Sequence, residues 1–66
     1  MKGRGWIGEG DRVRAWIRDE HTPVDGQDGT VILVDDMGTV HIDFDNGRSM
    51  WAIRGVDRVV KLPAEG

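Results

Sequence analysis

The side chains best suited to chemistry in this sequence are arginines and a tryptophan that alternate along one short segment. Arg14, Trp16 and Arg18 occupy every second position, so in an extended strand they share one face. Arginine and tryptophan are enriched among the residues that dominate binding at interfaces, and they also stack on nucleic-acid bases. We therefore expect Arg14, Trp16 and Arg18, together with Trp51 from a later strand, to form a partner-binding surface.

Trp16 also has a structural interpretation. It could pack beneath a polar loop at Asp19–Asp28 or beneath the segment that contains Trp6. Three tryptophans are difficult to bury in 66 residues, because a domain of this size buries only about 60% of the surface that its unfolded chain exposes. The sequence leaves both roles open.

Nucleophilic catalysis finds little support among the hydroxyl and imidazole groups. Ser49 is the only serine, and it follows a tight turn, where serine commonly serves the turn itself. An activated nucleophile needs an adjacent base, but His41 should point outward from the next strand and His21 lies in a polar loop. We predict no catalytic residues, and hence no enzyme.

A metal site is the next chemistry to consider. Asp35 and Asp36 are adjacent in a turn, whereas Asp43 and Asp45 lie at the far end of the following strand. Hard cations need several oxygen atoms that converge on one point, and carboxylates so placed do not converge within one chain. Without cysteine, a thiolate zinc site is excluded as well. We expect no metal and no cofactor.

Charge is distributed unevenly. Residues 1–18 carry a net charge of +3, residues 19–47 carry −8 with no Lys or Arg, and residues 48–66 carry +2. The overall charge of −3 disfavours general nucleic-acid binding, which depends on neutralising phosphates. A local basic face would form if the two chain ends met. The alternative is that opposite charges lie on neighbouring strands.

The length predicts one domain. We expect residues 1–9 to be a flexible Gly-rich arm anchored by Trp6 and Ile7, residues 10–62 to be the domain, and residues 63–66 to be a tail. No apolar run approaches the roughly 20 residues that span a bilayer, and the start lacks the apolar core of a secretory signal. We therefore expect a cytoplasmic protein that does not engage a membrane.

Alternating apolar positions separated by turn signals predict an all-β fold, a small SH3-like barrel of about five short antiparallel strands. The predicted strands are Arg12–Arg18, Gly29–Val34, Thr39–Phe44, Arg48–Ile53 and Arg58–Leu62. Gly55-Val56-Asp57 indicates a tight bend. The expected core consists of Val13, Ile17, Val31, Val40, Ile42, Phe44 and Val59.

The strongest hairpin signal is Asp-Asn-Gly at residues 45–47. A two-residue loop would pair Phe44 with Ser49 and bury Trp51. A three-residue loop would pair Phe44 with Arg48, so that Met50 turns inward and Trp51 is exposed. The chemistry of the turn permits both registers.

Several segments resemble one family, an uncharacterised group of small SH3-like domains of unknown function from bacteria, phages and mobile elements. The matching segments are GDRV at 10–13, GTVILVDDMG at 29–38, VHIDFDNGRSM at 40–50 and GVDR at 55–58. The resemblance covers roughly Gly10–Leu62 and implies a fold without an activity. The family often has leucine at position 50 and a small or polar residue at 51, which favours the register that exposes Trp51.

A second, more limited resemblance involves Gly10–Arg14, which also looks like the opening of the plasmid-borne SH3-like dihydrofolate reductases. It implies four chains around one pore. The reductase segment Val-Gln-Ile-Tyr corresponds here to Met50–Ile53, which lacks the polar residues that hold substrate.

Three functions are therefore considered. The first is a non-catalytic module for protein–protein interaction or self-association through exposed Trp and Arg side chains. The alternative is a nucleic-acid-binding barrel with phosphates held by Arg12, Arg14, Arg18, Arg48, Arg54 and Arg58. The third is the tetrameric reductase.

Overall fold

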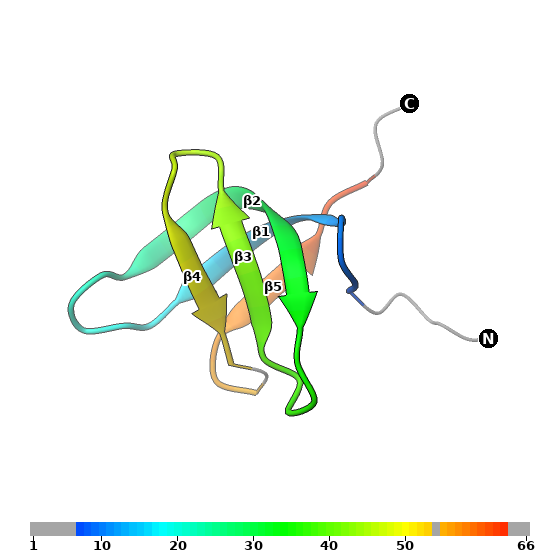
Figure 1. Ribbon diagram of the computed structural model, residues 1–66. Coiled ribbons are helices and arrows are strands. Elements are labelled where there is room, and N and C mark those ends of the chain that lie inside the picture. Colours follow the sequence, from blue (N-terminus) through cyan, green and yellow to red (C-terminus); the bar gives the residue numbers. More distant parts are fainter. Residues whose placement is uncertain (1–6, 54, 64–66) are drawn as a thin grey trace.

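A computed structural model describes residues 7–53 and 55–63, which form one curled antiparallel sheet (Figure 1). Its strands lie in the order β4-β3-β2-β1-β5. They are β1 (Arg12–Ile17), β2 (Val24–Val34), β3 (Val40–Phe44), β4 (Ser49–Ala52) and β5 (Arg58–Lys61). None of the described residues is helical, so none belongs to a helix that could cross a membrane. The predicted all-β class with five short antiparallel strands is confirmed.

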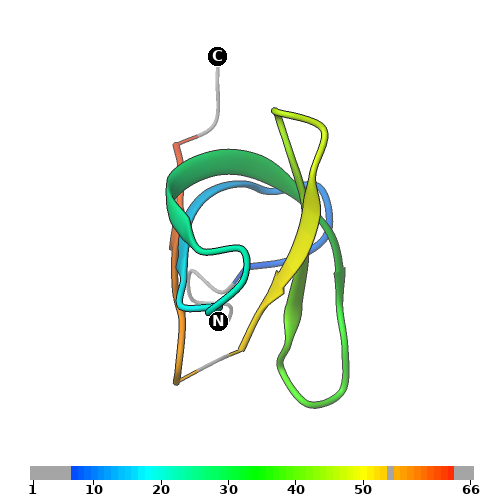
Figure 2. The ribbon, with the colours of Figure 1, turned by 90° about the vertical axis from the view of Figure 1, so that its left-hand side faces the viewer.

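The sheet curls around β2, which has 11 residues. The first part of β2 pairs with β1 and the last part pairs with β3, so Gly29 faces both Val13 and Phe44. A Cβ atom at Gly29 would stand 2.7 Å from Ile42 Cγ2 and 2.8 Å from the Asp43 carbonyl oxygen. Glycine therefore allows the close approach at this bend, and Figure 2 shows the sheet folded back on itself.

The loop between β1 and β2 is shorter than the sequence predicts. The sequence predicts a surface loop over Asp19–Asp28, but residues 24–28 belong to β2, and all of them except Gly26 pair with β1. Gly26, with φ of +77°, forms a bulge opposite Ala15 and Trp16, which explains how a Gly-containing polar segment enters a strand. Pairing with β1 outweighed the loop-like composition.

One apolar core lies inside the curl. Of the expected core residues, Val59 is half-buried and the others are buried: Val13, Ile17, Val31, Val40, Ile42 and Phe44. The core also contains Ile7, Ala15, Val24 and Ala52. The buried Ile7 is the described half of the anchor predicted for the N-terminal arm. Trp6, Arg54 and the end of the predicted tail lie outside the described residues.

A second bulge alters the outer surface of β2. Val31 pairs with Ile42 and Leu33 pairs with His41, which leaves Ile32 without a partner in the register. Both Ile32 and Leu33 are exposed. Residues 29–34 belong to a central strand, as predicted. Their apolar composition, however, does not place every side chain in the core.

The β3–β4 hairpin adopts the three-residue loop. The Phe44 N–H donates to the Arg48 carbonyl at 2.7 Å, and the Gly47 N–H donates to the Phe44 carbonyl at 3.0 Å. Gly47 has a φ of +91°. In this register Ala52 is buried and Trp51, opposite His41, lies on the outer face.

Candidate binding surface

Trp51 and Arg18 border the same depression, although 32 residues separate them in the chain. We call this depression the Trp51 groove and define it by the residues that line it: Ile17, Arg18, Asp19, Met50, Trp51, Ile53, Val56 and Asp57. It has a volume of about 120 Å³. One wall is the end of β1 and the other is β4 with the turn that follows. The groove exists because the curled sheet brings the ends of these two strands together.

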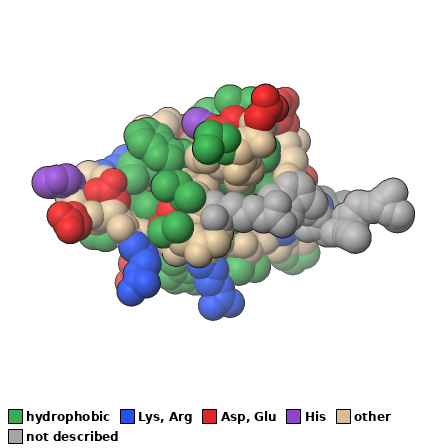
Figure 3. Space-filling view, turned by 90° about the horizontal axis from the view of Figure 1, so that it is seen from below, with side chains coloured by type: hydrophobic (Ala, Val, Ile, Leu, Met, Phe, Trp, Pro, Cys, Tyr) green, Lys and Arg blue, Asp and Glu red, His purple; other side chains and the backbone are tan. Residues whose placement is uncertain are grey.

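The groove exposes large apolar side chains. Trp51 is 56% exposed, Ile53 46% and Val56 61%. Figure 3 looks onto the end of the molecule where β4 finishes, and it shows hydrophobic side chains gathered there with both Lys or Arg and Asp or Glu side chains around them. An apolar cluster at one end of a small domain is more informative than exposed apolar residues scattered singly.

The turn beside the groove is tied to β1 by Asp57. Its Oδ1 accepts the Arg18 N–H at 3.0 Å and its Oδ2 accepts the Ile53 N–H at 2.9 Å. The Ile53 carbonyl accepts the N–H groups of Val56 and Asp57, so the predicted bend at residues 55–57 is confirmed. The sequence predicted this bend but not that Asp57 would connect it to β1. The frequency with which aspartate accepts backbone hydrogen bonds in turns could have suggested this contact.

Trp16 lies against a neighbouring depression. The guanidinium carbon of Arg58 stands 5.4 Å from the centroid of the Trp16 ring, and on the other side a Cβ atom at Gly26 would be 3.3 Å from Trp16 Nε1. Trp16 is therefore half-buried between a glycine and an arginine, a cation–π arrangement. Its depression shares Ile17, Arg18 and Val56 with the Trp51 groove.

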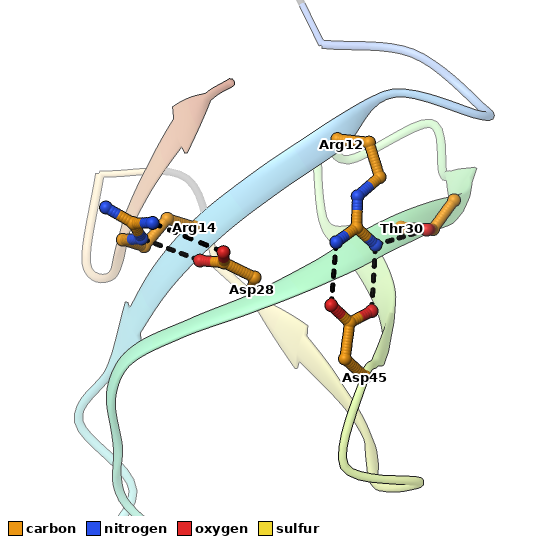
Figure 4. A network of polar contacts seen from close by, with 5 residues as sticks. All are labelled: Arg12, Arg14, Asp28, Thr30 and Asp45. Atoms are coloured by element: carbon orange, nitrogen blue, oxygen red, sulfur yellow. Dashed lines mark hydrogen bonds and ion pairs between the residues drawn. The ribbon is translucent and has the colours of Figure 1, made fainter. Parts of the chain in front are cut away.

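Arg12 and Arg14 lie apart from both depressions, in ion pairs across the sheet (Figure 4). Arg14 Nε is 2.6 Å from Asp28 Oδ1, and Arg12 holds both Asp45 oxygens at 2.8 and 2.6 Å and Thr30 Oγ1 at 3.0 Å. The hydrogen bond from Arg14 lowers the pKa of Asp28, and that from Arg12 lowers the pKa of Asp45. The interpretation that opposite charges lie on neighbouring strands is confirmed for Arg14 and Asp28, on β1 and β2. Arg12 instead pairs with Asp45 in the turn that follows β3.

The hydroxyl and imidazole groups considered for catalysis serve local contacts. Ser49 Oγ donates to Asp43 Oδ1 at 3.4 Å, and His41 Nε2 lies 3.2 Å from Asp35 Oδ2. The backbone N–H of Thr39, followed by the bond to His41, lowers the pKa of Asp35. Within the described ranges, no three His, Asp or Glu side chains are grouped so that they could hold a metal ion.

A comparison with family models matches residues 7–62 to the family described as Domain of unknown function (DUF4314). The chain belongs to this family. Neither the curated proteins nor the solved structures gave a significant match. The DUF4314 match contains all five strands, and its description attaches no activity to them.

Within this DUF4314 domain, the structure divides the four residues predicted for partner binding. Arg18 and Trp51 border one groove, and Trp16 lies in the adjoining depression. Arg14 is held by Asp28 elsewhere on the sheet. The sequence analysis did not predict that Ile53 and Val56 would line the groove, because the alternation of side chains along a strand does not extend to residues in a turn.

Proposed function

We propose that this DUF4314 domain is a non-catalytic protein-binding module and that the Trp51 groove is its contact surface. The observation that carries the proposal is the cluster of Trp51, Ile53 and Val56, each about half exposed around one depression. Covering an apolar side chain of this size stabilises a complex by roughly 1.5–3 kcal/mol when burial is complete. A partner that covers the cluster therefore gains binding energy from a small area.

Backbone pairing and side-chain hydrogen bonds connect the described parts of the groove. Trp51 projects from a strand paired with β3, and Asp57 fixes the turn that carries Ile53 and Val56. Surfaces that are already ordered lose less conformational entropy when they bind. Arg18 at the rim supplies the second residue type that is frequent in binding hot spots.

The charges favour a protein partner over nucleic acid. Arg12 and Arg14 are each bound to a carboxylate, which reduces their value as phosphate ligands, and the chain carries a net charge of −3. Affinity for nucleic acid depends on the number of phosphates neutralised. Self-association through the same groove belongs to the proposal.

The assignment of the fold to the SH3-like barrels is part of this proposal. A curled sheet of five antiparallel strands supports an SH3-like barrel. An origin in bacteria, phages or mobile elements and a cytoplasmic location stay predictions from the sequence.

The test is selection of peptides from a displayed random library on the immobilised protein. Trp51→Ala removes the centre of the groove, and Met37→Ala is the matched control, because Met37 is 88% exposed on the β2–β3 turn. We expect selected peptides to bind the wild type and Met37→Ala equally and to lose about tenfold or more in affinity for Trp51→Ala. Equal effects of the two substitutions would rule out the groove as the contact surface. Sedimentation of both variants extends the test to self-association.

A further inference from the structure

We infer that the Trp51 groove receives an extended acidic segment of a partner protein, which adds a strand to the open edge of β4. The inference rests on the proposed function and specifies the backbone conformation and charge of the partner. Two independent features carry it: hydrogen-bonding groups at the edge of β4, and an arginine at the rim that holds no carboxylate within the described ranges.

The open edge belongs to the first strand in the sheet order, because β4 pairs only with β3. The backbone hydrogen bond from Phe44 to Arg48 makes these two residues a hydrogen-bonded pair. Hydrogen-bonded and non-hydrogen-bonded pairs alternate along an antiparallel ladder, so the N–H and C=O of Met50 point toward β3 and those of Trp51 point away from it. Among the described residues, the backbone of Trp51 has no hydrogen-bond partner. This edge forms one wall of the groove, where an extended peptide can pair with it.

Arg18 forms the opposite wall. On the same strand face, Arg12 is bound to Asp45 and Arg14 to Asp28. No carboxylate of residues 7–53 or 55–63 pairs with the exposed Arg18 guanidinium. A guanidinium offers five donors in a fork that fits a carboxylate.

The two acidic side chains that line the groove with Arg18, Asp19 and Asp57, accept local backbone hydrogen bonds. Both oxygens of Asp57 accept backbone N–H groups. Asp19 Oδ1 accepts the N–H groups of His21 and Thr22 at 2.8 and 3.2 Å, which lowers the pKa of Asp19. Both carboxylates bond to backbone N–H groups, and neither is paired with the Arg18 guanidinium, so a carboxylate of a partner can pair with it.

Both features can be satisfied by one strand. Residues i and i+2 of an extended chain point to the same side, about 6.6 Å apart. An apolar or aromatic side chain can therefore cover Trp51 and Val56 while an Asp or Glu two positions away reaches Arg18. We expect the partner segment to contain this spacing, with unmodified N–H groups where it pairs with Trp51.

The experiment uses the full chain and peptides from the library selection described above. The selected sequences should contain an apolar residue two positions from Asp or Glu. For a synthetic peptide of this kind, Arg18→Gln in the protein and Glu→Gln in the peptide should each weaken binding about tenfold, as expected for one charge-assisted pair. Applied together, the two changes should be less than additive. Arg48→Gln, at an exposed position in the β3–β4 loop, is the matched control and should change affinity less than about twofold.

Methylation of successive backbone nitrogens in the peptide tests strand addition separately. One or more positions should lose about tenfold in affinity, because a methyl group removes the donor and blocks the approach. Tolerance at every position would refute strand addition, and equal effects of Arg18→Gln and Arg48→Gln would refute the acidic partner. In both cases, sensitivity to Trp51→Ala would still support the proposed function. If no peptide distinguishes the wild type from Trp51→Ala, the proposed function fails and the inference fails with it. A dimer that Trp51→Ala dissociates would identify a second copy as the occupant and overturn the inference.

Discussion

Asp57 accepts the backbone N–H of Arg18 at 3.0 Å and so joins the end of β1 to the turn before β5. The same carboxylate holds the Ile53 N–H at 2.9 Å, at the end of β4. One side chain therefore fixes three parts of the chain around the Trp51 groove, and its loss should loosen them together.

Asp57→Ala is expected to lower the free energy of unfolding by about 1–2 kcal/mol, because two backbone donors lose a charged acceptor. Urea denaturation measures the effect. Asp57→Asn should lower the free energy of unfolding by less, since the amide oxygen of asparagine can still accept one backbone hydrogen bond. Asp36→Ala removes an exposed carboxylate from the β2–β3 turn and serves as the control. Equal midpoints for Asp57→Ala and Asp36→Ala would show that the bridge contributes nothing to stability.

Gly47→Val should destabilise the domain by roughly 1 kcal/mol or more, because a branched side chain is disfavoured at positive φ. Gly47 has a φ of +91°, and no neighbouring atom lies within 4 Å of a Cβ placed there. The cost is therefore a property of the backbone conformation alone. Gly8→Val is the matched control, since Gly8 has equally open surroundings without a positive φ. An unchanged midpoint for Gly47→Val would contradict the turn geometry.

Gly29→Ala tests close packing rather than backbone conformation. The added methyl group would meet Ile42 Cγ2 at 2.7 Å and the Phe44 Cα at 2.9 Å, so β2 and β3 must separate. We expect a loss of about 1–3 kcal/mol, typical of overpacking. Gly8→Ala should leave stability almost unchanged. A similar result for both alanine variants would mean that the bend in β2 tolerates a side chain.

Acid should destabilise the fold through its ion-paired carboxylates. The pKa of Asp45 is lowered by its hydrogen bonds from Arg12, and that of Asp28 by those from Arg14. Each group binds protons less readily when folded than when unfolded, where its pKa is about 3.9. The stabilisation is therefore present above that value and disappears as the pH falls through the folded pKa.

The check is the urea midpoint between pH 7 and pH 2. It should stay nearly level down to about pH 5 and then fall. At pH 7 the urea midpoint of Asp45→Asn should be lower than that of the wild type, and it should fall less on acidification. Asp36→Asn, which removes a carboxylate without a described ion pair, should follow the wild-type profile. Parallel profiles for wild type and Asp45→Asn would exclude the pair with Arg12 as a source of acid sensitivity.

The two described tryptophans should respond differently to truncation. Trp16 is packed between Gly26 and Arg58, so Trp16→Ala should cost about 2 kcal/mol of stability, less than for a fully buried ring. Trp51 is 56% exposed, and Trp51→Ala should change stability by less than about 0.5 kcal/mol. Thermal unfolding of both variants measures this difference. Greater destabilisation by Trp51→Ala would show that its ring supports the fold.

The local pattern alone was sufficient for several elements. In β1, strict alternation predicts which side chains are buried, because successive residues of a strand point to opposite faces. At residues 45–47, the Asp-Asn-Gly turn predicts the hairpin, because only glycine adopts positive φ at little cost. Neither property depends on distant contacts.

The start of β2 and the composition of the groove depended on tertiary structure. Residues 24–28 resemble a loop in isolation, and they are a strand because β1 offers its edge to them. The sequence predicted Arg14, Trp16, Arg18 and Trp51 as one surface. Pairing with Asp28 removed Arg14 from it, whereas the curl of the sheet placed Arg18 beside Trp51. Periodicity orders the side chains along one strand, but which strand ends meet is decided by sheet curvature and by contacts such as the one from Asp57.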